Sequence, residues 1–181
     1  MTNMIQRLAM MVVLAMPSAA AAAADLADGL AAFNSKNYAL AVQVLEPLAQ
    51  RGDATAQVHM GLLHYHGHAV AESNERAFAW FLRAAEQGNT DGQFHLGNMY
   101  MYGLGVPITE SEPDRVAALW FFESARRGHA EAQYNLGILF LTGKGVYQND
   151  AEALKWIRRS AERHYEPARR FLGQYGDKLP R

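Results

Sequence analysis

A run of histidines is the densest group of potential metal ligands in this sequence. Four of them fall within ten residues: His59, His64, His66 and His68. Imidazole is a common zinc ligand, but His68 follows Gly67, where a helix is expected to end, so it does not share a helical face with His64. No HExxH motif accompanies them. We therefore expect packed or solvated histidines and no metal site.

The sequence motifs of nucleophilic and phosphate chemistry are also absent. The chain has no GxSxG turn, no SxxK motif and no GxxxxGK[ST] loop. It has no cysteine, which excludes a thiol nucleophile, a disulfide and a thiolate zinc site. The glycine pairs in residues 103–105 and 143–145 follow no strand pattern, so they do not form a dinucleotide fingerprint. We expect no catalytic residue and no cofactor.

Composition and charge exclude two further classes of protein. The 181 residues carry a formal net charge of −1, are 50% hydrophobic and are 19% charged. This composition argues against a disordered chain and, lacking excess Lys and Arg, against a nucleic-acid binder. The charge is uneven, with 5 basic and 12 acidic residues in 25–125 but 11 basic and 6 acidic in 126–181. In an elongated molecule this asymmetry would give an end-to-end dipole that can steer a partner.

The first 24 residues resemble a secretory signal. A weakly basic start precedes the apolar run at 8–16, which is much shorter than the ~20 residues that span a bilayer. Pro17 and an alanine-rich stretch follow. We expect cleavage after Ala24, location in the periplasm or outside the cell, and no stable membrane span after cleavage. A retained N-terminal helix is the alternative.

An internal repeat organises the rest of the chain. Glycines recur at intervals of 36 and 40 residues, and tryptophans at intervals of 40 and 36: Gly61, Gly97 and Gly137, then Trp80, Trp120 and Trp156. The glycines belong to similar blocks at 56–70, 92–106 and 132–146, and the tryptophans to blocks at 76–88, 115–128 and 151–164. The four additional residues of the middle repeat fall in the polar, proline-containing stretch 107–115, which predicts a surface loop.

Both blocks have helical spacing. Each block that contains a repeated glycine has three residues spaced four apart: a small residue, then an apolar residue, then an aromatic residue or a histidine. This spacing predicts one buried helical face. We expect these helices to end in left-handed glycines at 67, 103 and 143. The second helices should begin near the capping residues Ser73, Ser111 and Asn149, with Pro113 in the first turn of the middle one. An earlier pair is predicted at 25–34 and 37–51, where Pro47 predicts a kink or a late restart.

A helical hairpin of this kind buries its apolar face by stacking on its neighbours. We therefore predict an all-α solenoid in which the repeated glycines permit close approach of a neighbouring helix backbone. The three tryptophans should make the largest contacts between helices.

The repeated pattern A-x-x-x-L-G-x-x-Y-x-x-G-x-G-V, followed by W-[YF]-x-x-A-A-x-x-G, resembles the Sel-one-like repeat, a relative of the tetratricopeptide repeat. The resemblance implies a right-handed α-solenoid of antiparallel helix pairs with a concave inner face. It divides the chain into a divergent hairpin (25–52), three repeats (53–88, 89–128 and 129–164), a partial cap (165–176) and a tail (177–181). Its usual role implies a protein partner.

A second face of the first helices carries aromatic, amide and imidazole groups away from the core stripe. Its residues form what we call the first-helix ladder: His59, His66, His95, Asn98, Tyr102, Asn135 and Thr142. Stacked repeats would place them side by side on the concave wall, where such groups suit protein recognition. His59 and His95 on this wall would make binding sensitive to pH near neutrality.

The functional hypothesis is a non-enzymatic, exported protein that binds or scaffolds another protein through its concave surface. One alternative is an immunity-type periplasmic inhibitor of an effector enzyme. The other is a cell-wall or β-lactam hydrolase.

Overall fold

The computed structural model describes residues 19–176, and within this range every regular element is an α-helix. The helices are α1 (Ala19–Asn34), α2 (Tyr38–Gln50), α3 (Ala54–His66), α4 (Asn74–Glu86), α5 (Thr90–Tyr102), α6 (Pro113–Arg126), α7 (Ala130–Thr142), α8 (Asp150–Glu162) and α9 (Glu166–Tyr175). The predicted tail, residues 177–181, lies outside the described part of the chain.

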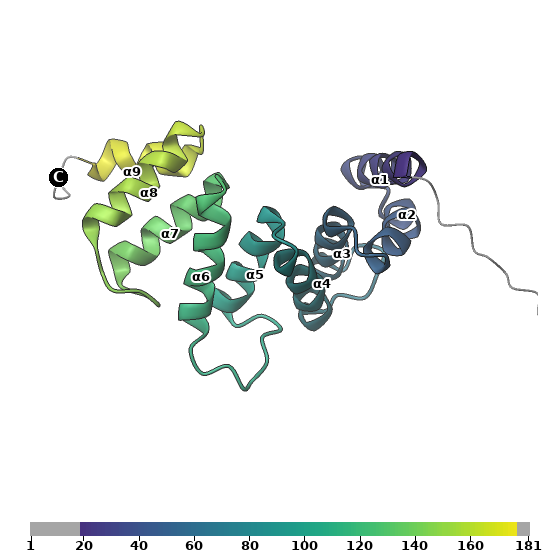
Figure 1. Ribbon diagram of the computed structural model, residues 1–181, viewed down its shortest axis with the longest axis horizontal. Helices are drawn as coiled ribbons and strands as arrows, with labels where there is room; N and C mark the ends of the chain where they lie inside the picture. Colours follow the sequence, from purple (N-terminus) through teal and green to yellow (C-terminus); the bar gives the residue numbers. More distant parts are fainter. Residues whose placement is uncertain (1–18, 177–181) are drawn as a thin grey trace, which may run out of the picture.

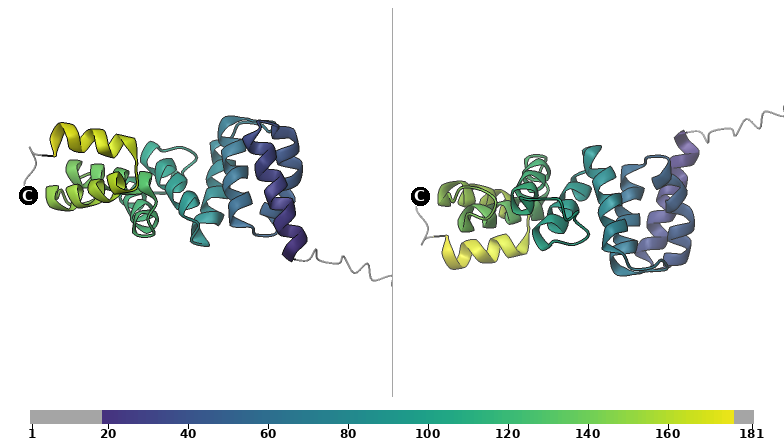
Figure 2. Two further views of the ribbon diagram at one scale, coloured as in Figure 1. Left: turned by 90° about the horizontal axis from the view of Figure 1, so that it is seen from above. Right: turned by 90° about the horizontal axis from the view of Figure 1, so that it is seen from below.

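The helices stack in chain order along one long axis, with α1 and α9 at opposite ends (Figures 1 and 2). Each packs mainly on its neighbours in the sequence, and α3 also contacts α1 and α5. The first helices α3, α5 and α7 therefore alternate with the second helices α4, α6 and α8. The prediction of an all-α solenoid of antiparallel helix pairs is confirmed.

Most helix ends form as their residue types predict. Gly67, Gly103 and Gly143 end α3, α5 and α7 with φ of 65°, 66° and 70°, in the left-handed region that glycine adopts without strain. Ser73 and Asn149 cap α4 and α8 through side-chain oxygens. Pro113 takes the first position of α6, as expected, but Ser111 is not the capping residue: Glu112 is the N-cap, without a side-chain cap bond.

The N-terminal hairpin forms with the predicted bounds except at the start of its first helix. The first helix begins at Ala19 rather than residue 25, because the alanine-rich stretch before it has high helix propensity. The second runs through Pro47 without a restart, held by the buried Leu45 and Leu48 on either side of the proline. The predicted signal, residues 1–24, lies outside the described residues apart from its last six, so its cleavage stays a prediction. No described helix is both long enough and apolar enough to cross a bilayer.

The repeated glycines accept a side chain of a neighbouring helix, and only at Gly137 does a neighbouring backbone atom, the Ala153 carbonyl oxygen, also come close. A Cβ built on Gly61 would lie 2.5 Å from the ring of Phe81, and one on Gly97 would lie 2.8 Å from the ring of Phe121. At Gly137 the corresponding contact is Ile157 at 2.5 Å. The expected close approach is therefore made by the residue that follows each tryptophan, on the second helix of the same repeat.

That arrangement also corrects the role of the tryptophans. Trp156 is buried, with 5% of its surface exposed, but Trp80 and Trp120 are only half-buried. On α4 and α6 the most deeply buried large side chain is the next residue, Phe81 at 1% and Phe121 at 0%. A step of one residue turns the side chain by about 100°, which leaves the indoles of Trp80 and Trp120 at the edges of the core.

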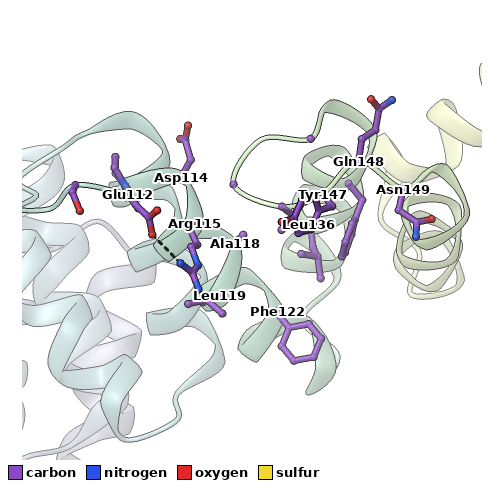
Figure 3. A pocket seen from close by; sticks show the side chains of 16 residues that line it. Glu112, Asp114, Arg115, Ala118, Leu119, Phe122, Leu136, Tyr147, Gln148 and Asn149 are labelled. Carbon is purple, nitrogen blue, oxygen red and sulfur yellow. Dashed lines mark hydrogen bonds and ion pairs between the residues drawn. The ribbon is translucent and has the colours of Figure 1, made fainter.

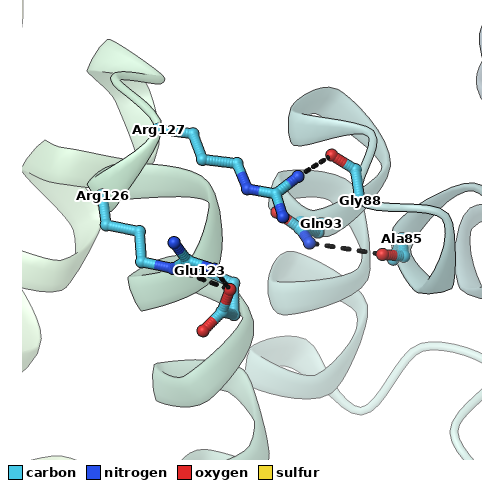
Figure 4. Close-up of polar contacts among 6 residues, drawn as sticks. All are labelled: Ala85, Gly88, Gln93, Glu123, Arg126 and Arg127. Carbon is cyan, nitrogen blue, oxygen red and sulfur yellow. Dashed lines mark hydrogen bonds and ion pairs between the residues drawn. The ribbon is translucent and has the colours of Figure 1, made fainter.

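A buried glutamine in each first helix joins the repeats. The Nε2 atoms of Gln57, Gln93 and Gln133 donate to the carbonyls of Ala49, Ala85 and Ala125 at 3.0, 3.2 and 3.0 Å. Each carbonyl lies near the end of the preceding helix, where it also accepts a bond from the backbone N–H of the glycine three residues later. Figure 4 shows Gln93 with Ala85, beside the bond from Arg127 to the Gly88 carbonyl. The glutamines recur at the repeat period, a signal that the sequence analysis missed.

Candidate functional site

Four residues of the first-helix ladder line one groove between α3 and α5. The groove has a volume of about 320 Å³, and these four are His66, His95, Asn98 and Tyr102. Phe81 and Phe94 contribute aromatic walls. Tyr102 is 67% exposed, so it stands at the open side of the groove. The arrangement offers aromatic surface together with amide and imidazole groups, and no full charge among the residues that line it.

His95 lies against the aromatic walls of this groove. Its ring stacks on Phe81 with centroids 4.7 Å apart, and Phe94 lies 5.2 Å away. Burial lowers the pKa of His95 to about 4, although the nearby Asp91 carboxylate acts in the opposite direction. His95 is therefore neutral at physiological pH. The expectation that it changes charge near neutrality is wrong.

An amide pair extends the ladder to the next repeat. The Nδ2 of Asn135 on α7 donates to the Oδ1 of Asn98 on α5 at 3.4 Å. This bond places ladder residues of two consecutive first helices side by side. A side-chain amide can make four hydrogen bonds, so each partner has three positions left after this one, and the pair retains hydrogen-bonding capacity for a ligand.

The first and last residues of the ladder, His59 and Thr142, make contacts outside the groove. His59 packs edge-on against Phe33 with ring centroids 4.8 Å apart, and its Nδ1 lies 2.9 Å from the Thr55 carbonyl. Thr142 is exposed, and its hydroxyl donates to the Ile138 carbonyl within its own helix at 2.9 Å. The structure thus gathers the middle of the ladder into one groove and leaves His59 and Thr142 outside it.

The remaining histidines of the early cluster make separate contacts. His64 is buried with its Nδ1 3.2 Å from the Ala71 carbonyl, and His68 stacks on Tyr38 at 4.2 Å. Within residues 19–176 no group of three or more metal-ligating side chains is placed to hold an ion.

Two polar residues beside the groove were missed by the sequence analysis. Asp91 on α5 and the N-cap of α7, His129, meet at 3.3 Å between Oδ1 and Nε2. This hydrogen bond lowers the pKa of Asp91, while partial burial opposes the shift. Phe94 stacks on His129 at 4.6 Å, which joins the pair to the aromatic wall. Neither residue belongs to the first-helix ladder, because His129 lies before its helix and Asp91 in the first turn.

Comparison with known sequences and structures shows similarity to one repeat family. A family model of the Sel1 repeat matches residues 54–89, 90–129 and 130–165. The chain is 33% identical to a Sel1 repeat protein from Oxalobacter formigenes, with a TM-score of 0.72 over 81% of this chain and 59% of that one. It is 35% identical to c5321, a protective antigen of uropathogenic Escherichia coli with an SLR fold, with a TM-score of 0.68 over 74% of this chain and 28% of that one.

A shorter match is to HRD3A, an ERAD-associated E3 ubiquitin-protein ligase component of Arabidopsis thaliana, at 36% identity over 64 residues. This match covers 35% of the present chain and 9% of HRD3A. The chain therefore spans less than two thirds of the length of each of these three relatives.

Proposed function

This chain belongs to the Sel1 repeat family, whose members generally serve as scaffolds for protein–protein interaction, and we propose that it binds another protein through its first-helix ladder. The observation that carries the proposal is the groove between α3 and α5, where His66, His95, Asn98 and Tyr102 meet. Aromatic anchors surrounded by neutral hydrogen-bonding groups are typical of the residues that dominate protein interfaces.

The neutral state of His95 defines the kind of contact that the groove makes. With a pKa of about 4, the imidazole offers one donor and one acceptor to a partner at physiological pH. The amide pair of Asn98 and Asn135 offers the same kind of group one step further along the solenoid. The partner segment that fits this wall therefore has uncharged polar and apolar groups.

We infer a binding protein rather than an enzyme. Ser124 and Ser160 are fully buried, and their hydroxyls donate to the carbonyls of Thr90 and Ala130 at 2.8 and 2.6 Å. Because both hydroxyls are buried and hydrogen-bonded, these two serines cannot reach a substrate. This argues against a role for them as nucleophiles in a hydrolase.

We also propose that the protein is exported, on the basis of the N-terminal order of basic start, apolar run and small residues. Mass spectrometry of the protein from the periplasmic fraction would test this, and a processed N-terminus at or near residue 25 is the expected result. An unprocessed chain in the cytoplasm would overturn it.

Affinity capture with paired ladder variants tests the binding proposal. The processed chain is used as bait, and the captured protein is then titrated against Asn98→Ala and Tyr102→Ala. We expect each variant to weaken binding by about tenfold or more, because anchor residues at the centre of an interface typically contribute about 2 kcal/mol. Tyr175→Ala, on the exposed surface of α9, is the matched control and should bind as the parent protein does.

The possible outcomes separate the functional classes. Capture of no partner, or equal binding by both ladder variants, would contradict the proposed surface. A captured enzyme that loses its activity in a one-to-one complex would identify the protein as an immunity-type inhibitor.

A further inference from the structure

A large hollow lies beside the second helix α6, away from the groove between α3 and α5. It has a volume of about 1080 Å³ and separates α6 from the α7–α8 connection (Figure 3). We call it the α6 groove, and its apolar lining includes Ala118, Leu119, Phe122, Phe140, Val146 and Tyr147. Such a groove between successive repeats needs a local cause, since the same helix pairs recur on both sides of it.

The first cause is a missing ring. The position two residues before each repeated tryptophan holds Phe78 on α4, Ala118 on α6 and Leu154 on α8. Phe78 packs edge-on against Tyr100 with ring centroids 5.4 Å apart. Phe140 stands where Tyr100 stands in the earlier repeat, but Ala118 presents only a methyl group to it. Beside Ala118 the α6 groove therefore lacks the ring that Phe78 supplies one repeat earlier.

The second cause is a change in the outward positions of the same helix. Leu119 is 58% exposed and Phe122 is 43% exposed. On α4 the equivalents are Ala79 and Leu82, and on α8 they are Lys155 and Arg158. The middle repeat therefore has an alanine, Ala118, where the repeats on either side have a phenylalanine and a leucine. It also exposes Leu119 and Phe122 at positions where α8 has charged side chains. Exposure of two large apolar side chains beside one hollow is typical of an interaction site.

The polar rim of the groove is neutral overall. Glu112 pairs with Arg115 at 2.9 Å, and Asp114 pairs with Lys144 at 3.2 Å. Ser111 and Glu112 come from the longer loop of the middle repeat, which projects beside α6 (Figure 1). Because each rim charge already has an opposite partner, an uncharged occupant matches the site, whereas a charged one would have to break a pair.

From these features we propose that a partner protein docks an uncharged segment into the α6 groove and places a phenylalanine-like side chain over Ala118, against Phe140. This surface is independent of the first-helix ladder, so the protein would hold two partners, or two parts of one partner, on different faces.

A short peptide provides a defined probe. Acetyl-Gly-Gly-Phe-Gly-Gly-amide is titrated into the isotopically labelled chain, residues 25–181, and followed by NMR, with the Phe→Ala peptide as reference. We expect the Phe peptide to shift signals of Ala118, Leu119 and Val146, and the Ala peptide to leave them in place. Ala118→Phe should remove the response, and it should raise the midpoint of thermal unfolding by ~3 °C because it fills the hollow as Phe78 does in its own repeat.

Two further variants complete the test. Ala79→Phe adds the same ring to the exposed face of α4 and should leave the peptide response unchanged. Leu119→Ser changes only an exposed wall and should weaken the response by roughly tenfold, which keeps the test valid if Ala118→Phe does not fold. Equal shifts with both peptides would overturn the proposal, as would equal shifts with free toluene, which would indicate a site for small apolar molecules. Dimerisation that Ala118→Phe abolishes would also overturn it, by identifying a second copy as the occupant.

Discussion

His95 packs between two aromatic side chains, and this position sets its charge. Phe81 stacks on it from the second helix of the preceding repeat, and Phe94 precedes it on α5. The sequence placed His95 on the ladder, because helical spacing alone determines which residues share a face. It did not indicate burial, which depends on a ring contributed by another helix.

This environment predicts a loss of stability in acid. The unfolded chain protonates His95 near its ordinary pKa of 6.5, whereas burial lowers the pKa in the folded chain to about 4. The unfolded state therefore binds more protons between these values, and the free energy of unfolding falls as the pH drops from about 6.5 to about 4, by up to about 3 kcal/mol. Chemical denaturation across this range would measure the slope.

The matched variants for this prediction are His95→Gln and His66→Gln. The first should flatten the acid dependence, and the second, at an exposed histidine that lines the same groove, is the control for a change of histidine to glutamine. Parallel pH profiles for His95→Gln and the parent protein would show that Asp91, His129 or other groups cause the acid loss instead.

At the scale of helices, equivalent positions in the repeat differ in what covers them. Gly97 on α5 faces the ring of Phe121, but a Cβ on Gly173 of α9 would have no atom within 4 Å. We expect Gly97→Ala to destabilise the protein by about 1–3 kcal/mol through overpacking, and Gly173→Ala to stabilise it by up to about 1 kcal/mol through helix propensity. Urea denaturation of the two variants measures both effects. Changes of the same sign would show that the packing at Gly97 does not determine its cost.

The sequence predicted the helices better than the contacts between them. Glycine at the ends of α3, α5 and α7 has a local cause, and so do the caps at Ser73 and Asn149, so these features could be predicted from the residue types. The path through Pro47, the half-buried Trp80 and Trp120, and the α6 groove at Ala118 arise from residues on other helices. Composition and spacing do not contain that information.

At the scale of the whole molecule, the helices differ in how many neighbours hold them. Among the described residues α9 packs chiefly on α8 and buries only Ala168. Its counterpart α7 packs on both α6 and α8 and buries five residues. In a solenoid, stability is approximately a sum of local terms. We therefore expect α9 amides to exchange with deuterium faster than those of α7, as measured by native-state exchange and mass spectrometry. Equal protection would indicate that the solenoid opens as a single unit.

The placement of α1 and α9 at opposite ends has a mechanical consequence (Figure 2). Tension applied between these ends would act on every interface between successive helices. The least stable interface would open first while the others stayed closed, so the molecule would lengthen in steps. A partner that contacts two neighbouring repeats would raise the force needed to separate them.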